Sequence, residues 1–176
     1  LMANFRRDTV NTLLEKDSSL DLDVLDDERE RITKMLRERG YFNFSKNFIQ
    51  FFADTTSVAK ENMAKVFVRV VENAVDSNAY RRYFVRNISV NFDYDPMLTA
   101  EQVDSMYNML YYNGYNILYR DKLKIKPKMI IETIQLQQME LYDARRVIDT
   151  YARLQALNLF KMVNIDFKEV ESDGDV

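Results

Sequence analysis

The sequence has 176 residues, of which 47% are hydrophobic and 30% are charged, proportions that fit one globular domain or two small ones. A net charge of −3 provides no electrostatic reason to expect a nucleic-acid partner. The chain has no cysteine, no histidine and only 3 glycines, which excludes disulfides, thiol catalysis, histidine-based triads and glycine-rich phosphate loops.

The first third of the sequence predicts two helices. Residues 3–16 carry apolar side chains at helical spacing, and two serines then interrupt the pattern. A second helix is predicted to begin at an N-cap, Asp27, with Glu30 as its capping-box partner. Gly40 is placed where a left-handed residue ends a helix, because glycine has no Cβ that would clash in that conformation.

A β-hairpin is predicted to follow this helix. Residues 44–52 are rich in aromatic and branched side chains, and residues 63–72 alternate between apolar and charged side chains. The segment between them begins with turn-forming residues, Asp54 to Ser57. The order up to residue 72 is therefore helix, helix, strand, strand.

The middle of the chain predicts a strand, a helix and a small hairpin. Residues 83–94 read as a strand that ends at Asp95-Pro96. Thr99 to Gln102 form a capping box, and apolar residues at helical spacing predict a helix up to Asn113-Gly114. Residues 116–125 then suggest a short hairpin.

The last third predicts two helices and a strand. Lys126-Pro127 is typical of a helix start, since proline lacks the N–H that the first helical turn leaves unpaired. Residues 142–157 carry an apolar stripe typical of a longer amphipathic helix, and residues 161–169 alternate as a strand.

Two helix-to-strand corners carry a resemblance to a known family. The first runs from Leu25 through Glu28, Arg29, Arg31, Ile32, Leu36, Gly40, Tyr41, Phe42 and Phe44 to Ile49, Phe51 and Asp54. The second runs from Tyr142 through Thr150, Tyr151, Arg153, Leu154 and Leu157 to Phe160, Lys161, Val163, Ile165 and Phe167. Together they resemble the POTRA (polypeptide-transport-associated) domains of BamA- and TamA-like outer-membrane assembly proteins, the bacterial surface antigen family, in a form typical of Bacteroidetes.

The resemblance implies an α+β fold with two β-α-α-β-β units, each a three-stranded sheet covered on one face by two helices. Residues 1–75 would form a unit that lacks its first strand. Residues 80–176 would form a second unit with an insertion at about 96–126 and without its last strand. Both units are thus expected to be truncated in this chain, and a dimer could arise from the edges so exposed.

The resemblance also implies a function. The chain would be a periplasmic binding or scaffold module of an outer-membrane protein, would engage unfolded outer-membrane proteins and subunits of the assembly machinery, and would reach the membrane only through a C-terminal barrel absent here. No catalysis, no cofactor, no metal and no nucleic acid are expected.

Strand addition is the mechanism that a small sheet suggests, because an edge strand has free N–H and C=O groups that can pair with an extended peptide. The alternative is that neighbouring elements block these edges and that the units are spacers. The predicted peptide-binding edge residues are Asn47, Phe48, Ile49, Gln50, Phe51, Phe52, Val163, Asn164, Ile165, Asp166 and Phe167.

Other interpretations compete with this one. An exported surface or carbohydrate-binding module could use the tyrosines between Tyr107 and Tyr119, and a cofactor-free enzyme could use carboxylates and tyrosines. The acidic residues 21–28 suggest calcium, but Leu25 stands where an EF-hand loop needs an oxygen ligand, so helix-start electrostatics explains them better.

Overall fold

The computed structural model describes residues 11–56, 63–71 and 77–170, and its secondary structure is mixed α and β. It divides into two compact units, one of residues 1–84 and 141–144, the other of residues 85–140 and 145–176. The predicted α+β class is confirmed. Within the described ranges, no helix has the length and apolar character needed to span a membrane.

The helix of the first unit begins earlier than predicted. Helix α2 spans Leu22–Arg37, and its N-cap is Asp21, whose side chain accepts a hydrogen bond from the N–H of Asp23. The predicted N-cap at Asp27 is therefore wrong, because acidic side chains are also favourable inside the first turns, near the positive end of the helix dipole. The helix predicted over residues 3–16 lies partly outside the described residues, and residues 11–20 contain no helix.

The segment before α2 is attached to the helix by one buried carboxylate. Glu28 is only 3% exposed and accepts hydrogen bonds from the Thr12 hydroxyl and the Leu13 N–H, each at 3.0 Å. Arg31 donates to both carboxylate oxygens, at 2.8 and 2.9 Å. A buried charge is tolerated when it is paired and hydrogen-bonded in this way.

Gly40 ends the helical segment as predicted. Its φ of +97° lies in the left-handed region, and the Leu36 carbonyl accepts hydrogen bonds from the N–H groups of Arg39 and Tyr41. The chain then reverses, so that Tyr41 and Phe44 are buried beside the helix.

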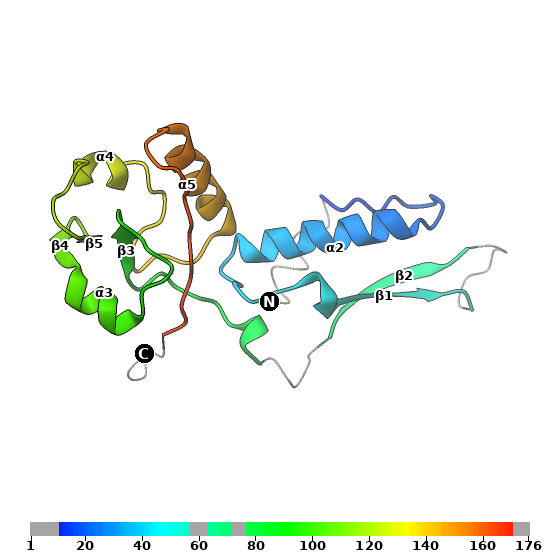
Figure 1. The fold of residues 1–176 in the computed structure, drawn as a ribbon. Helices are drawn as coiled ribbons and strands as arrows, with labels where there is room; N and C mark the ends of the chain where they lie inside the picture. The colour runs from blue at the N-terminus through cyan, green and yellow to red at the C-terminus, as the bar shows by residue number, and fades with distance from the viewer. Residues whose placement is uncertain (1–10, 57–62, 72–76, 171–176) are drawn as a thin grey trace. The chain divides into compact units, whose positions relative to one another are not determined.

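The predicted hairpin is confirmed in the first unit. Strand β1 (Ile49–Asp54) pairs antiparallel with β2 (Lys65–Val70), in register Ile49 to Val70. Helix α2 runs along this hairpin (Figure 1), and one core of buried residues joins them: Ile32, Leu36, Tyr41, Phe44, Ile49 and Val70. The strand predicted over residues 83–94 is not formed at its start, where Phe84 makes an isolated β-bridge with Leu141.

The second unit has a three-stranded sheet in the order β3-β5-β4. Strand β3 (Ile88–Asn91) pairs parallel with β5 (Tyr115–Tyr119), and β5 pairs antiparallel with β4 (Asn108–Tyr112). The expected insertion at about 96–126 thus supplies two of the three strands.

The middle of the chain departs from the prediction at a turn. The Thr99–Gln102 capping box is present, but helix α3 (Ala100–Met106) ends before β4 and does not continue to Asn113. Asn113 and Gly114 both have positive φ, of 49° and 87°, as a two-residue hairpin turn requires. Their partner strands are therefore β4 and β5, and the hairpin predicted over residues 116–125 is wrong.

Two helices follow the sheet, as predicted. Helix α4 (Pro127–Ile131) begins with its proline in the first turn, and α5 spans Ala144–Ala156. Thr150 of α5 is 1% exposed, and its hydroxyl accepts from the Gln135 N–H at 2.9 Å and donates to the Arg146 carbonyl at 2.7 Å. This hydroxyl joins α5 to the chain after α4.

Replacing Thr150 by valine should destabilise the second unit by about 1–2 kcal/mol, because valine keeps the shape but leaves the Gln135 N–H without its acceptor. The measurement is native-state hydrogen exchange of the α5 amides. Thr150→Ser, which keeps the hydroxyl, is the control and should lose less stability than Thr150→Val. Equal losses in both variants would show that packing of the methyl group, and not the hydrogen bond, is responsible.

The strand predicted over residues 161–169 is absent. This segment is irregular and belongs to neither sheet, although Phe160 stacks on Phe92 with ring centroids 6.3 Å apart. Alternation of side chains makes a segment compatible with a strand, but a strand forms only where a neighbour completes its hydrogen-bond ladder. None of the described strands does so for this segment.

Candidate peptide-binding edge

Strand β1 pairs with β2 along one edge. Its other edge is not paired with any strand in the part of the chain that the structure describes. The Val71 N–H donates to the Phe48 carbonyl, which continues the β1–β2 ladder by one step. Because hydrogen-bonded and non-bonded pairs alternate in antiparallel strands, Gln50 and Phe52 then direct their backbone groups toward β2. The backbone groups of Ile49, Phe51 and Ala53 point toward the open edge.

The start of this edge is occupied by groups of the same unit. The Ile49 N–H donates to the Lys46 carbonyl in the short 3₁₀ helix η1 (Lys46–Phe48). The Ile49 carbonyl accepts from Arg29 Nε at 3.2 Å, and the Arg29 guanidinium lies 5.3 Å from the centre of the Phe51 ring. Only Phe51 and Ala53 therefore keep outward backbone groups that an added strand could use.

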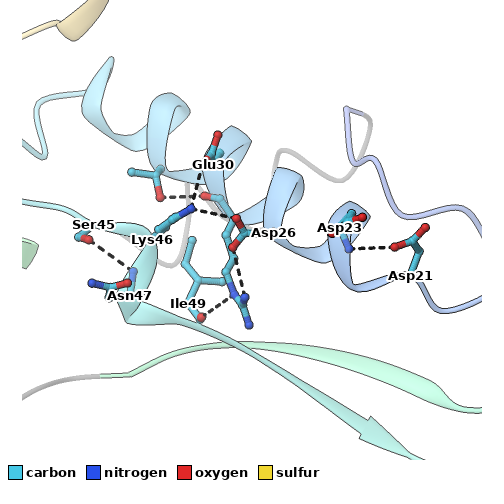
Figure 2. A network of polar contacts seen from close by, with 10 residues as sticks. Asp21, Asp23, Asp26, Glu30, Ser45, Lys46, Asn47 and Ile49 are labelled. Atoms are coloured by element: carbon cyan, nitrogen blue, oxygen red, sulfur yellow. Dashed lines mark hydrogen bonds and ion pairs between the residues drawn. The ribbon is translucent and has the colours of Figure 1, made fainter.

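Polar side chains of α2 and of Lys46 in η1 lie around the covered Ile49 carbonyl. Figure 2 shows Asp26, Glu30, Lys46 and Ile49 close together, and Lys46 Nζ lies 2.9 Å from a carboxylate oxygen of Asp26 and of Glu30. Asp26 also accepts from Arg29 at 3.4 Å, which holds the guanidinium near β1. The hydrogen bond from Lys46 keeps the pKa of Asp26 below its usual value, and the same bond raises the pKa of Lys46.

The structure separates the predicted site residues into three settings. Asn47 and Phe48 lie in η1, where the Ser45 side chain accepts from the Asn47 N–H and caps the turn. Ile49 to Phe52 lie in β1. Val163, Asn164, Ile165, Asp166 and Phe167 lie in the irregular segment, so the expected edge strand is not formed there. The Asn164 side chain instead donates to Asp166 at 2.6 Å.

The face of the hairpin opposite the core carries an aromatic pair. Phe52 and Phe67 are direct cross-strand partners and are 41% and 53% exposed. The Arg69 guanidinium lies 4.7 Å from the centre of the Phe52 ring. An added strand would extend this apolar face beside Phe52 while pairing with the backbone of β1.

The tyrosines between Tyr107 and Tyr119 do not form one binding platform. Tyr115 is buried and donates to the Leu136 carbonyl at 2.8 Å, and Tyr107 lies beneath the Arg120 guanidinium, which is 5.2 Å from its ring centre. Tyr111 is 66% exposed. Tyr107, Tyr111 and Tyr115 therefore lie in three different settings and do not form one continuous stacked surface.

An open hollow of about 420 Å³ lies beside Arg120 in the same unit. The guanidinium donates to Asp95 at 3.1 Å and to the Tyr107 hydroxyl at 3.2 Å, and the Asp93 carboxylate accepts from the Arg120 N–H. These bonds engage the charged groups with one another and fasten β5 to the end of β3. Among the described residues, no three acidic side chains gather as a metal site would need.

Arg29 belongs to the first helix-to-strand corner, but the sequence did not indicate that its side chain would contact β1. It lies in the middle of a charged helix, where arginine most often faces solvent, and its contact with Ile49 joins residues 20 positions apart. Only knowledge of which helix face lies over the β1 edge could have identified it.

The comparisons with known proteins concern the fold. No protein-family model and no curated protein matches this sequence. A solved structure, the crystal structure of POTRA domains 3–5 of Haemophilus influenzae BamA, is similar to this chain with a TM-score of 0.50 at 15% identity. The match covers 93% of this chain and 48% of that chain, so this chain spans about half of the BamA fragment. A likeness at this identity shows a POTRA-like fold.

Proposed function

We propose that this chain is a periplasmic binding module of an outer-membrane protein assembly or translocation factor. It binds extended segments of unfolded barrel proteins, or of partner subunits, by strand addition at β1, and it performs no catalysis. The observation that carries this proposal is the open edge at Phe51 and Ala53, on a hairpin whose other side is held by a buried core.

The wider context of the proposal rests on the POTRA-like fold. The chain would be part of a BamA- or TamA-like protein of the bacterial surface antigen family, in a form typical of Bacteroidetes. Its two POTRA-like units would correspond to residues 1–75 and 80–176. The residues at about 96–126 would be an insertion relative to a minimal unit, one that supplies two strands of the sheet in this chain. Val163 to Phe167 would become a strand only when a neighbour pairs with them.

Backbone pairing suits this function because it does not depend on one partner sequence. N–H and C=O groups supply affinity in any extended segment, and alternate side chains supply selectivity. On β1, the exposed Phe52 next to Phe67 favours segments with apolar or aromatic residues on the face opposite α2. Alternating segments of this kind are typical of transmembrane barrel strands.

Ala53→Pro should weaken peptide binding strongly while leaving the unit folded. The Ala53 N–H faces the open edge, so proline removes a donor that the added strand needs and no donor that β2 uses. We expect an eight-residue peptide of alternating valine and threonine, acetylated and amidated, to bind at least about tenfold more weakly, since the ring also obstructs the edge. The measurement is NMR titration of the backbone amides of the full 176-residue chain.

Ala53→Ser is the matched control and should bind the peptide like the parent chain, because serine retains the N–H. Equal peptide affinity in the proline and serine variants would contradict strand addition at β1. Shift changes confined to residues 107–119, with β1 unaffected, would favour a module that uses the tyrosine segment instead.

A further inference from the structure

We infer that Arg29 is a stop at the start of the β1 edge, which prevents an added strand from pairing with Ile49 and so sets its register. The inference rests on the proposed strand addition and specifies which residues the partner can pair with. It starts from the Ile49 carbonyl, which faces the open edge and already accepts a hydrogen bond from a side chain of the same unit.

The contact imitates the one that an added strand would make. A neighbouring strand would donate a backbone N–H to the Ile49 carbonyl, and Arg29 Nε donates to that oxygen at 3.2 Å. The guanidinium also covers the Phe51 ring, at 5.3 Å from its centre. An incoming strand that continued past Phe51 would therefore meet the arginine where its next backbone group should be.

Asp26 holds the Arg29 side chain in this position, and the Arg29 backbone accepts one further hydrogen bond. Asp26, one turn earlier on α2, accepts from its guanidinium at 3.4 Å, and Asp26 is itself paired with Lys46 at 2.9 Å. The Thr33 hydroxyl donates to the Arg29 backbone carbonyl at 2.8 Å. The Arg29 side chain is 32% exposed, so it is partly enclosed between the helix and the strand.

The N–H of Ile49 completes the stop from the other side. It donates to the Lys46 carbonyl within η1, so neither backbone group of Ile49 is offered to a partner. The partner that fits is an extended segment paired with Phe51 to Asp54, whose end near Ile49 turns away from the sheet. The partner would therefore pair with a short, fixed stretch of β1, while the sequence of the partner could vary.

The test is Arg29→Met in the full chain, titrated with the same valine–threonine peptide. Methionine keeps the apolar stem over Phe51 but frees the Ile49 carbonyl, so one more backbone hydrogen bond can form. We expect binding about fivefold tighter, the change that one added hydrogen bond produces. The Ile49 carbonyl ¹³C resonance should also shift on peptide addition in the variant and stay unchanged in the parent.

Arg69→Met is the matched control, because Arg69 also lies over a phenylalanine of β1 but on the face away from the core. It should leave peptide affinity and the Ile49 carbonyl response as in the parent chain. Arg29→Leu provides a second variant if methionine disturbs folding, since leucine also favours the helix and has no side-chain donor. It should also free the Ile49 carbonyl.

The outcomes separate the inference from the proposed function. If the peptide binds the parent, and Arg29→Met and Arg29→Leu bind it with unchanged affinity and no Ile49 response, the stop is overturned and strand addition stands. Binding of the peptide to the Arg29 variants but not to the parent chain would mean that Arg29 blocks the whole edge. Absence of binding to every protein overturns both.

Discussion

Gly40→Ala should destabilise the first unit by about 3 kcal/mol, the largest effect that we expect from one methyl group. Part of the cost is conformational, because the φ of +97° is unfavourable for any residue with a Cβ. The remainder is steric, since the added Cβ would lie 2.8 Å from Cγ and 2.9 Å from Cδ1 of Leu141. Native-state hydrogen exchange of the α2 amides measures the loss in this unit alone.

Two variants separate these contributions. In a Leu141→Ala background the steric part disappears, so Gly40→Ala should cost only about 1–2 kcal/mol there. Gly114→Ala, at a φ of +87° and with its nearest neighbour 3.5 Å away, should show a similar purely conformational cost in the second unit. If Gly40→Ala costs the same in the parent and in the Leu141→Ala background, the clash with Leu141 does not contribute to the loss of stability.

Glu28→Gln should destabilise the first unit by about 3 kcal/mol. The carboxylate is almost fully buried and receives hydrogen bonds from Arg31, Thr12 and Leu13, so the amide loses the charge and at least one of these bonds. Exchange of the Leu13 amide should accelerate most, because its acceptor is weakened. Glu30→Gln is the control, since the Glu30 side chain is 63% exposed and solvent-exposed ion pairs such as its pair with Lys46 contribute little to stability.

The same carboxylate predicts a dependence on pH. Burial by itself would raise the pKa of Glu28, but the hydrogen bonds from Arg31, Leu13 and Thr12 outweigh burial and hold the pKa below its ordinary value of 4.5. A carboxyl whose pKa is lowered by folding stabilises the fold above its unfolded pKa, and this contribution is lost as the pH falls through the folded pKa. The stability difference between the parent and Glu28→Gln should therefore shrink below about pH 4.5, and a constant difference would contradict the role of the charge.

The local patterns of the sequence determined several elements by themselves. Gly40 at positive φ, the Thr99–Gln102 capping box, the proline that begins α4 and the β1–β2 hairpin were all predicted from neighbouring residues. Each depends on steric limits or hydrogen bonds that close within a few residues, which sequence spacing records directly. The two aromatic corners also indicated a POTRA-like fold, and the similarity of this chain to the BamA POTRA structure agrees with it.

Tertiary structure decided which segments became strands and which edge has no partner strand among the described residues. Residues 108–112 form β4 because β5 lies beside them across the Asn113–Gly114 turn, whereas residues 161–169 alternate better and yet have no ladder partner in either sheet. The coverage of Ile49 by Arg29 depends on how α2 lies along β1, a relation between residues 20 positions apart. Strand pairing and edge access are contacts between distant parts of the chain, and side-chain periodicity carries no information about which neighbour will be present.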